Sequence, residues 1–471
     1  MAQKIYVDGQ WRTPTGERHI DVVNPATEAV IGSIGVASKA DVDDAVAAAR
    51  RAFLTFSRTS REERIDLLGR VLGAYVARRQ ELADALVEEL GAPAKFAFET
   101  QSATGLMHLQ TTIELLRDYP FETRQSDRTM VRHEPIGVVA LITPWNWPIN
   151  QIMCKIAPAL ATGNTMVHKP SELTPFTAHV IAQILDDAGV PKGVYNLVDG
   201  DGTVGAMLAE HANVDMVSFT GSTRAGIDVA KRAADTVKRV HQELGGKSPN
   251  IILDDADLGA AIGGNLYRLM LNSGQSCHAP TRMLVPRSRM EEAKGVIAHI
   301  LQGITVGDPH GDAYMGPVVS RTQWERIQSY IDAGQKEGAT LLAGGGGRPN
   351  GLSKGYYVKP TVFVDVTNDM RIAREEIFGP VLCVIGYDDL DEAVRIANDT
   401  PYGLAAFVQS ASDDKAAEVG ARLDAGMIFL NGAGEDPLAP FGGTKMSGNG
   451  REWGLAAFGE FMESKALIRA A

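Results

Sequence analysis

Short apolar runs alternate with segments of helical periodicity through the middle of the chain, and this alternation limits the fold more than any other feature. Four of these runs are IGVVALITP (136–144), NTMVHKP, VYNLVDG and DMVSFTG. Runs that are apolar throughout are typical of strands buried on both faces of a parallel sheet. The pattern predicts an α/β fold with a doubly wound sheet and a ligand at the carboxyl ends of its strands.

The same alternation continues beyond residue 245. Further strand-like runs are PNIIL, TRMLVP, TVFVDV, AAFVQS and GMIFL. Because a chain of 471 residues is too long for a single hydrophobic core, two or three domains are expected. The later runs therefore predict a second α/β unit.

Local signals predict several element ends in the first half of the chain. The Asp-Gly pair at 8–9 is typical of a tight hairpin. Ser60 and Glu63 form a capping-box pattern at the start of a long helix, which Gly91 is expected to end. Thr174, followed by proline, predicts an N-cap with proline at the first helical position.

Charge and cysteine usage exclude some partners. With 46 basic and 58 acidic side chains, the net charge is −12, which argues against a nucleic-acid partner because such proteins need basic patches. The three cysteines are widely spaced and show no metal-ligand spacing, so we expect a reduced compartment and no metal. No apolar signal core or membrane-length run occurs. A cytoplasmic protein without a membrane partner is expected.

The stretch NSGQSCHAPTR contains Cys277, a candidate nucleophile. Its small neighbours leave room for a substrate, and the site must lower the thiol pKa or supply a base, since the thiolate is the reactive form. His278 follows directly, but consecutive side chains of an extended segment point in opposite directions. We therefore expect His278 to line a tunnel rather than to take a proton. A buried structural thiol is the alternative for Cys277.

Two other polar residues suit the same chemistry. Glu243, in HQELGGKSP, precedes two glycines where the backbone must approach another group closely. A carboxylate in a partly apolar pocket has a raised pKa and can accept a proton from a thiol or water. Asn146, between two tryptophans in TPWNWPIN, can donate its amide to a developing oxyanion. The alternatives are a solvated glutamate and an asparagine that satisfies its own turn.

A third group of residues suits a dinucleotide. FTGSTRAG (219–226) places glycines at a passage from strand to helix, where backbone N–H groups can approach a phosphate, although it is not the usual dinucleotide fingerprint. Lys169 can donate to ribose or phosphate, and Glu172 can accept from ribose hydroxyls. Glu376 and Phe378, in REEIFGPVL, could grip a ribose and pack against a ring. An ordinary acidic surface pair is the alternative for the last segment.

Together these segments resemble the aldehyde dehydrogenase superfamily over nearly the whole chain. The matching motifs are PWNWP, PALATGNTMVHKPSELTP, FTGST, ELGGKSPNII, NSGQSC, EEIFGPV, NDTPYGLAA and PFGGTKMSGNGRE. Each is modest alone, but eight in the right order are specific. The resemblance implies a Rossmann-like parallel-sheet cofactor domain (1–117 and 137–244), an α/β catalytic domain (245–445) and a small β oligomerisation element (118–136 and 446–471).

The resemblance also implies roles for individual residues. It makes Cys277 the nucleophile, Glu243 the general base and Asn146 the oxyanion donor, and it places Lys155 in a proton path. The implied cofactor contacts are Ile142, Pro144, Trp145, Lys169, Glu172, Gly202, Phe219, Gly221, Ser222, Leu244, Glu376 and Phe378. The implied substrate-tunnel residues are Trp147, Asn150, Gln151, His278 and Phe441.

The implied activity is the NAD(P)-dependent oxidation of an aldehyde to its acid through a cysteine thiohemiacetal and thioester. Glu243 favours the hydrolysing branch, because CoA-acylating relatives generally lack this residue. Glu172 favours NAD, whereas Lys169 and Arg224 favour some use of NADP. The motifs look closest to bacterial members, which suggests a hydrophobic aliphatic aldehyde; an aromatic one is equally compatible.

Two segments depart from the family pattern, and other classes remain open. His278 replaces a small or apolar residue, and GAGEDPLAP precedes Phe441. One alternative is a cysteine-dependent esterase or thiol hydrolase that needs no dinucleotide, and another is a non-catalytic relative. By resemblance, the protein is expected to form a homodimer or homotetramer.

Overall fold

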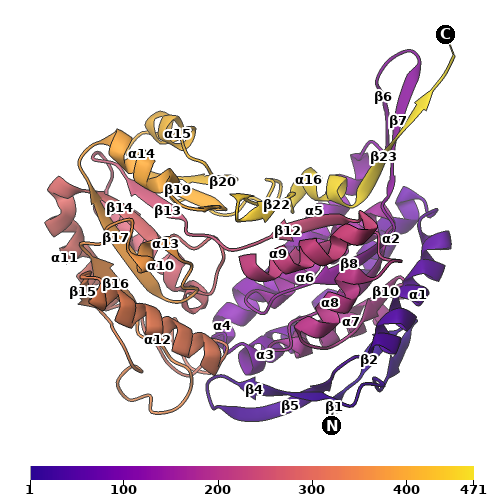
Figure 1. Ribbon diagram of the computed structural model, residues 1–471, viewed down its shortest axis with the longest axis horizontal. Helices are drawn as coiled ribbons and strands as arrows, with labels where there is room; N and C mark the ends of the chain where they lie inside the picture. The colour runs from indigo at the N-terminus through magenta and orange to yellow at the C-terminus, as the bar shows by residue number, and fades with distance from the viewer. Residues whose placement is uncertain (1, 471) are drawn as a thin grey trace.

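Two large sheets, each covered by helices on both faces, form two lobes of the molecule (Figure 1). The computed structural model describes residues 2–470. The chain passes from the first lobe to the second directly after the strand that ends at Glu243. The predicted α/β class with parallel sheets is confirmed.

The first lobe is built on an eight-stranded sheet in the order β22-β12-β11-β8-β9-β10-β2-β3. Its five central strands are parallel, whereas β2 and β22 join antiparallel at either side. The strands are β2 (Ile5–Val7), β3 (Gln10–Arg12), β8 (Val138–Ile142), β9 (Thr165–Lys169), β10 (Tyr195–Leu197), β11 (Met216–Thr220), β12 (Arg239–Glu243) and β22 (Gly448–Asn449).

Alternate residues of the central strands feed two separate cores. Val139 and Leu141 pack into one core with α2, α3, α5, α6 and α7, while Val138 and Ala140 pack into the other with α1, α8 and α9. This double burial explains why these strands are apolar throughout. The helices are α1 (Lys39–Phe56), α2 (Arg61–Ala77), α3 (Arg79–Glu89), α4 (Ala94–Phe96), α5 (Ser102–Asp118), α6 (Pro148–Thr162), α7 (Pro175–Asp187), α8 (Gly202–Glu210) and α9 (Thr223–Ala233).

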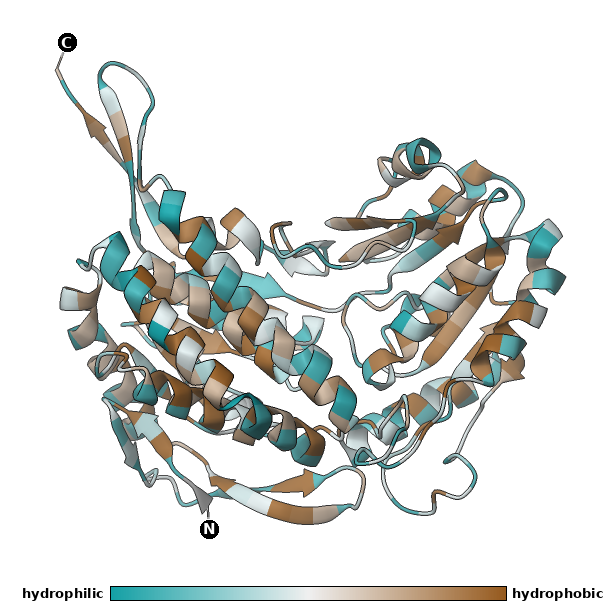
Figure 2. Ribbon diagram, turned by 180° about the vertical axis from the view of Figure 1, so that it is seen from behind, coloured by the Kyte–Doolittle hydropathy of each residue, from teal (hydrophilic) through white to brown (hydrophobic). Residues whose placement is uncertain are grey.

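The second lobe is built on a seven-stranded sheet in the order β15-β16-β17-β14-β13-β19-β20, parallel except for β15. Its strands are largely hydrophobic (Figure 2). They are β13 (Pro249–Ile252), β14 (Arg282–Pro286), β15 (Thr340–Ala343), β16 (Thr361–Val364), β17 (Val381–Tyr387), β19 (Ala405–Gln409) and β20 (Met427–Leu430). The helices that follow β13 are α10 (Leu258–Met270), α11 (Met290–Leu301), α12 (Arg321–Lys336), α13 (Arg371–Arg374), α14 (Leu390–Asn398), α15 (Asp413–Gly420) and α16 (Gly454–Glu460).

A three-stranded arm projects from the first lobe beside the carboxyl end of the described chain (Figure 1). It consists of β6 (Glu122–Arg124), β7 (Thr129–Pro135) and β23 (Met462–Ile468), all antiparallel. Because β22 pairs with β12, residues 446–471 do not lie in the arm alone. Smaller sheets are formed by β1 (Ala2–Gln3), β4 (His19–Asn24) and β5 (Ala29–Gly35), and by β18 (Tyr402–Gly403) with β21 (Thr444–Lys445). Within residues 2–470, no helix is long and apolar enough to cross a membrane.

The helix expected from Ser60 to Gly91 is wrong in its extent, because it is two helices. Ser60 and Glu63 do form the capping box of α2, but the chain turns at Arg78 and starts α3. Arg78 is held there by Asp187, at 2.7 Å. Since α2 packs on α5, α6 and α7 while α3 packs on α7 and on the segment Ala97–Gln101, tertiary contacts override a pattern that locally favours one helix.

The N-terminus of α7 is capped by a distant residue and not by Thr174. The helix begins after Thr174, as expected, yet the Thr174 side chain makes no capping hydrogen bond. The fully buried Glu89 instead accepts the backbone N–H groups of Phe176, at 2.7 Å, and Thr177, at 2.9 Å. A carboxylate supplied by α3 thus satisfies donors that the sequence assigned to a neighbouring threonine.

Candidate active site

Cys277 follows a tight segment of left-handed backbone. Asn272, Ser273 and Gly274 have φ values of 53°, 55° and 75°, a run that non-glycine residues rarely adopt. A side chain on Gly274 would strike the backbone of Gly379. The segments NSGQSC and EEIFGPV, about a hundred residues apart in the printed sequence, therefore touch through their glycines.

Two cavities meet at Cys277. A cavity of about 530 Å³ is lined by aromatic and polar side chains, and a second, of about 220 Å³, opens on the other side of the same cysteine. The first includes Trp147, Asn150, Gln151, His278 and Phe441, all of which were predicted to line a substrate tunnel. The geometry gives Cys277 access to two different ligands at once.

The smaller cavity gathers most of the predicted nicotinamide-side residues. Its lining includes Pro144, Trp145, Asn146, Gly221, Ser222, Leu244, Glu376 and Phe378. The rings of Trp145 and Phe378 meet edge to face at 5.3 Å. Ser222 is the N-cap of the eleven-residue helix α9, and its hydroxyl accepts from the N–H of Ala225 at 3.3 Å.

Five predicted cofactor residues are not among those that line this cavity: Ile142, Lys169, Glu172, Gly202 and Phe219. Lys169 is buried at the end of β9; its ammonium donates to the carbonyl of Gly200 at 2.6 Å and lies 3.6 Å from Glu172. Gly202 begins α8. Ile142 and Phe219 are buried with the cavity-lining Leu244 in one hydrophobic core of the first lobe.

The paired glycines after Glu243 are required by two close approaches. A side chain on Gly245 would strike the Glu376 carboxylate, and one on Gly246 would strike the carbonyl of Cys277. The backbone N–H of Gly246 donates to Glu376 at 2.9 Å. The sequence had indicated a close approach at this turn, and the structure identifies both partners.

Asn146 is buried with its amide directed at the segment that carries the cysteine. Its Nδ2 donates to the carbonyl of Gln275 at 3.2 Å, and Asn272 in turn donates to the carbonyl of Asn146 at 2.7 Å. The first bond fixes the amide near Cys277 and leaves its second N–H available, and the second holds the Asn146 backbone carbonyl. The side chain therefore links two segments and does not simply satisfy its own turn.

The protein alone raises the pKa of Cys277. Burial is the main cause, and the carboxylates of Glu243 and Glu376 add to it; the backbone N–H of His278 works in the opposite direction. The sequence had suggested that the site would lower the thiol pKa or supply a base. The polypeptide raises this pKa instead, because the thiol is buried and the negative charges of Glu243 and Glu376 disfavour the thiolate.

Glu243 lies behind the cysteine among buried charges. Burial raises the pKa of its carboxyl, and the neighbouring Glu452 raises it further. Glu452 is held by an ion pair with Lys155 and accepts the thiol of Cys154 at 3.3 Å. Sequence reasoning did not single out Glu452, although it ends the motif PFGGTKMSGNGRE.

Sequence reasoning also missed the outer wall of the larger cavity. Arg268, on α10, pairs with Glu435 and stacks over Phe429 at 4.5 Å. His278 Nε2 also contacts Glu435, at 3.0 Å. Glu435 belongs to GAGEDPLAP, which had been noted as distinctive, but nothing in its spacing points to α10.

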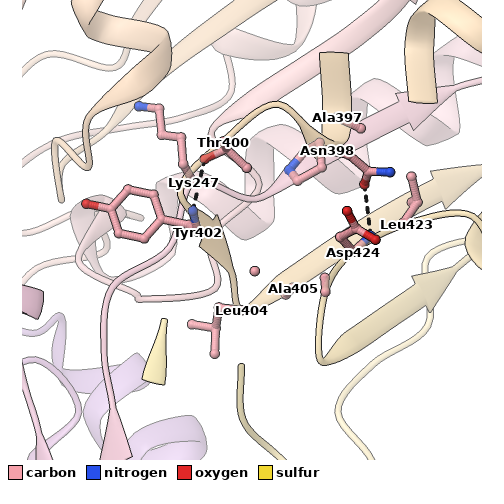
Figure 3. A pocket seen from close by; sticks show the side chains of 13 residues that line it. Lys247, Ala397, Asn398, Thr400, Tyr402, Leu404, Ala405, Leu423 and Asp424 are labelled. Atoms are coloured by element: carbon pink, nitrogen blue, oxygen red, sulfur yellow. Dashed lines mark hydrogen bonds between the residues drawn. The ribbon is translucent and has the colours of Figure 1, made fainter. Parts of the chain in front are cut away.

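A third cavity, beneath Lys247, is too small to hold a ligand (Figure 3). Its volume is about 10 Å³, room for one water. Two hydrogen bonds join its lining residues: the Tyr402 N–H donates to Thr400 Oγ1, and the Asp424 N–H donates to Asn398 Oδ1. Burial lowers the pKa of Lys247 to about 8.

The fold consists of two helix-covered sheets. Cys277 lies between a cavity near the carboxyl ends of parallel strands and a second, aromatic-walled cavity. This combination defines an α/β oxidoreductase class. A family model described as the aldehyde dehydrogenase family matches residues 11–467. The chain belongs to the aldehyde dehydrogenase family, and it is an NAD(P)-dependent aldehyde dehydrogenase. This confirms the resemblance seen in the motifs, and the alternative of a dinucleotide-free thiol hydrolase is not favoured.

Named relatives and solved structures are similar over nearly their full lengths. A 3-succinoylsemialdehyde-pyridine dehydrogenase of Pseudomonas sp is 53% identical, covering 99% of this chain and 98% of the relative. Aldehyde dehydrogenase C of Pseudomonas syringae, a cysteine-to-alanine variant solved with NAD+ and octanal, is 50% identical with a TM-score of 0.98, covering 99% and 96%. A Mycobacterium tuberculosis aldehyde dehydrogenase solved with NAD+ is 38% identical with a TM-score of 0.97, covering 100% and 98%.

Proposed function

We propose that this enzyme oxidises a hydrophobic aldehyde to its carboxylic acid with NAD+, through a thioester on Cys277. The observation that carries the proposal is the position of Cys277 at the meeting point of the two cavities. An aldehyde in the larger cavity and a dinucleotide in the smaller one would both reach the sulfur. Glu243, behind the cysteine, supports the hydrolysing branch of the family.

The residues around Cys277 suit each step of this chemistry. The Cys277 thiolate attacks the aldehyde carbon, and Asn146 Nδ2 with the Cys277 backbone N–H stabilises the oxyanion of the thiohemiacetal. A nicotinamide bound in the smaller cavity supplies the two-electron acceptor that this oxidation requires. Glu243 then takes a proton from water, the oxygen attacks the thioester carbonyl, and the thiolate leaves as the acid forms.

Lys155 has a supporting role in this scheme. Its ammonium is fully buried and paired with Glu452, and both charges influence the pKa of Glu243. A buried ion pair beside a general base can compensate the change in charge when the base gains or loses a proton. We assign Lys155 and Glu452 to the proton path behind Glu243.

The residues of the smaller cavity fit a nicotinamide dinucleotide. Gly245 leaves space for the Glu376 carboxylate, which points toward the cavity and can accept from ribose hydroxyls. The N-terminus of α9 can face a phosphate. Lys169 is already bonded to Gly200 and Glu172, so its charge is less available to a 2′-phosphate. These contacts support NAD over NADP, and two solved relatives contain NAD+.

The larger cavity supports a hydrophobic aliphatic or aromatic substrate. Near the cysteine its wall is formed by Trp147, Met107, Phe441 and Trp453, while polar groups gather at its outer end around His278. One relative is named for a succinoylsemialdehyde-pyridine, and another was solved with octanal. We propose that the substrate of this enzyme is an aldehyde of similar size, either aliphatic or ring-bearing.

The arm supports a homo-oligomer. Strand β23 carries the exposed side chains Leu467 and Ile468, 41% and 71% exposed. An exposed strand edge with apolar residues is a ready template for pairing with a second copy. We propose that residues 118–136 and the arm part of 446–471 form the oligomerisation element, with cofactor (1–117, 137–244) and catalytic (245–445) domains in the two lobes.

A substrate panel tests the proposal. Aliphatic, terpenoid and aromatic aldehydes are assayed with NAD+ and NADP+, and Cys277→Ala is the control. We expect NAD+-dependent oxidation of octanal-sized or aryl aldehydes, abolished in the variant. Turnover that needs no dinucleotide, or that persists without Cys277, would contradict the proposal.

A further inference from the structure

His241 stands next to the proposed base in the interior of the first lobe. It lies two residues before Glu243 on β12, so both side chains point to the same face of the strand. His241 Nε2 is 3.6 Å from Glu243 Oε1. Both residues are 2% exposed.

Neither side chain has another partner. Within residues 2–470, both ring nitrogens of His241 and both carboxyl oxygens of Glu243 lack a hydrogen bond. Buried polar groups are normally paired, and an unpaired one costs about 1–3 kcal/mol. It is therefore unusual for an unpaired imidazole donor and an unpaired carboxylate acceptor to lie side by side. A small side-chain rotation would bring the two within the 2.7–3.2 Å typical of a hydrogen bond.

The backbone closes this pair off from solvent. A side chain on Gly450 would strike the His241 ring, and one on Gly442 would meet the Glu243 carboxylate. Glu243 is absent from the lining residues of both cavities at Cys277 in the described chain. The carboxylate must therefore turn toward Cys277 to act on a water there, and its position in the structure is a resting one.

We propose that His241 is a positioning residue that receives Glu243 in its resting orientation and keeps it ionised by donating Nε2–H to Oε1. The inference rests on the proposed role of Glu243 as the base that activates the hydrolytic water. In each cycle Glu243 turns toward the thioester, accepts a proton from water, and releases it along the proposed proton path of Lys155 and Glu452 before returning to His241. The histidine itself stays neutral and transfers no proton.

The surrounding charges are consistent with a neutral imidazole. Burial lowers the pKa of His241 to about 4, so its ring carries one N–H at neutral pH. The charged and titratable groups near Glu243 come from β12, α6, the cysteine segment and the residues around α16: His241, Cys154, Lys155, Cys277, Arg451, Glu452 and Glu460. Within the described residues, only His241 among them has an uncommitted side-chain nitrogen within 4 Å of the carboxylate.

The test separates hydride-coupled acylation from deacylation. In single-turnover mixing of aldehyde and NAD+, the burst of NADH reports acylation, and the following steady state reports thioester hydrolysis. His241→Leu removes the donor, whereas His241→Gln keeps an amide N–H near the Nε2 position. We expect the burst to be unchanged in both variants.

Deacylation should respond to His241→Leu alone. Loss of the donor makes ionised Glu243 less stable, so the acidic limb of the deacylation rate moves to higher pH. Because the bond exists only in the resting orientation, a shift of one unit should accompany a plateau rate about tenfold higher, with the rate below both limbs unchanged. His241→Gln should restore the wild-type limb. His168→Asn, which removes a buried imidazole on β9 that bonds Thr143 and Tyr195, should lower the melting temperature without moving the limb.

Three results would overturn the inference. They are an unshifted limb in His241→Leu, an equal shift in His241→Gln, or equal losses in burst and deacylation. The variant Glu243→Gln distinguishes failure of the positioning role of His241 from failure of the proposed role of Glu243 as the general base. If that variant accumulates thioester while His241→Leu behaves as wild type, only the role of His241 fails; if it accumulates none, the role of Glu243 itself fails.

Discussion

His278 and Glu435, one from each segment that departs from the family pattern, are joined by a hydrogen bond of 3.0 Å between Nε2 and Oε1. The same carboxylate pairs with Arg268, and together these contacts hold its pKa below the usual range despite burial. The trio forms the polar outer wall of the substrate cavity. The two departures in the sequence are therefore a single structural feature.

This wall should influence substrate choice. Glu435→Ala leaves Arg268 without its counter-charge, so aldehydes bearing a distal carboxylate should bind better. We expect their KM to fall about fivefold, the scale of ~1 kcal/mol for a partly exposed charge. The KM of short uncharged aldehydes should not change. Glu418→Ala, at an exposed glutamate on α15, is the control, and an identical change there would contradict a local effect.

Asn146 should contribute through the oxyanion. Asn146→Ala removes a buried donor fixed beside Cys277, and loss of one such donor lowers kcat by about 10²–10³, or ~3–4 kcal/mol. The dissociation constant for NAD+, measured by fluorescence titration, should be nearly unchanged. A kcat close to wild type would remove Asn146 from this role.

Glu243 should be needed after the oxidation step. Glu243→Gln cannot take a proton from water, so the thioester should accumulate after a normal NADH burst. Mass spectrometry of the quenched enzyme should show the acyl group on the peptide that contains Cys277. With Cys277→Ala as the blank, absence of this adduct would show that hydrolysis does not depend on Glu243.

The raised pKa of Cys277 predicts slow alkylation of the free enzyme at neutral pH. Because thiolate is the reactive form, the rate with iodoacetamide should rise with pH throughout the range from 7 to 9. Glu376→Gln removes a negative charge that disfavours thiolate, so it should lower the pKa and speed alkylation at pH 7. A bound oxidised nicotinamide, which is cationic, should act in the same direction.

Cys277→Ala gives the background of the buried Cys154 and Cys383 in this assay. A rate that does not depend on pH would mean that the resting thiol is already ionised. Slower alkylation in Glu376→Gln would contradict the assigned sign of its charge effect.

Glu172 should discriminate between dinucleotides. A carboxylate there repels a 2′-phosphate, and it also pairs with Lys169 at 3.6 Å. In Glu172→Gln we expect kcat/KM with NADP+ to rise about threefold to tenfold relative to NAD+, as ~1 kcal/mol of repulsion is removed. An unchanged ratio would place the preference elsewhere.

Much of the fold could be predicted because its signals are local. The apolar strands, the hairpin at 8–9 and the capping box at Ser60 depend on neighbours in the sequence, and all appear where expected. The turn at Arg78 and the capping of α7 by Glu89 could not be predicted. Both depend on contacts between helices that no local pattern records.

The candidate site divides in the same way. The motifs indicated Cys277, Asn146 and Glu376 because their residue types and flanking glycines are characteristic of the family. Glu452 and Arg268 carried no such signal, since each reaches its partner across the fold. His241 lies within a quoted motif segment, yet only its burial and its unpaired nitrogens distinguish it.

The sequence alone determines that this chain is an α/β aldehyde dehydrogenase and indicates Cys277 as its candidate nucleophile, because strand periodicity and the motif residues are encoded locally. The tertiary structure decides which groups surround that cysteine. It buries the sulfur near the charges of Glu243 and Glu376, which raises the thiol pKa, and it joins His278 to Glu435. Electrostatic energies depend on distance and burial, which exist only once the chain is folded.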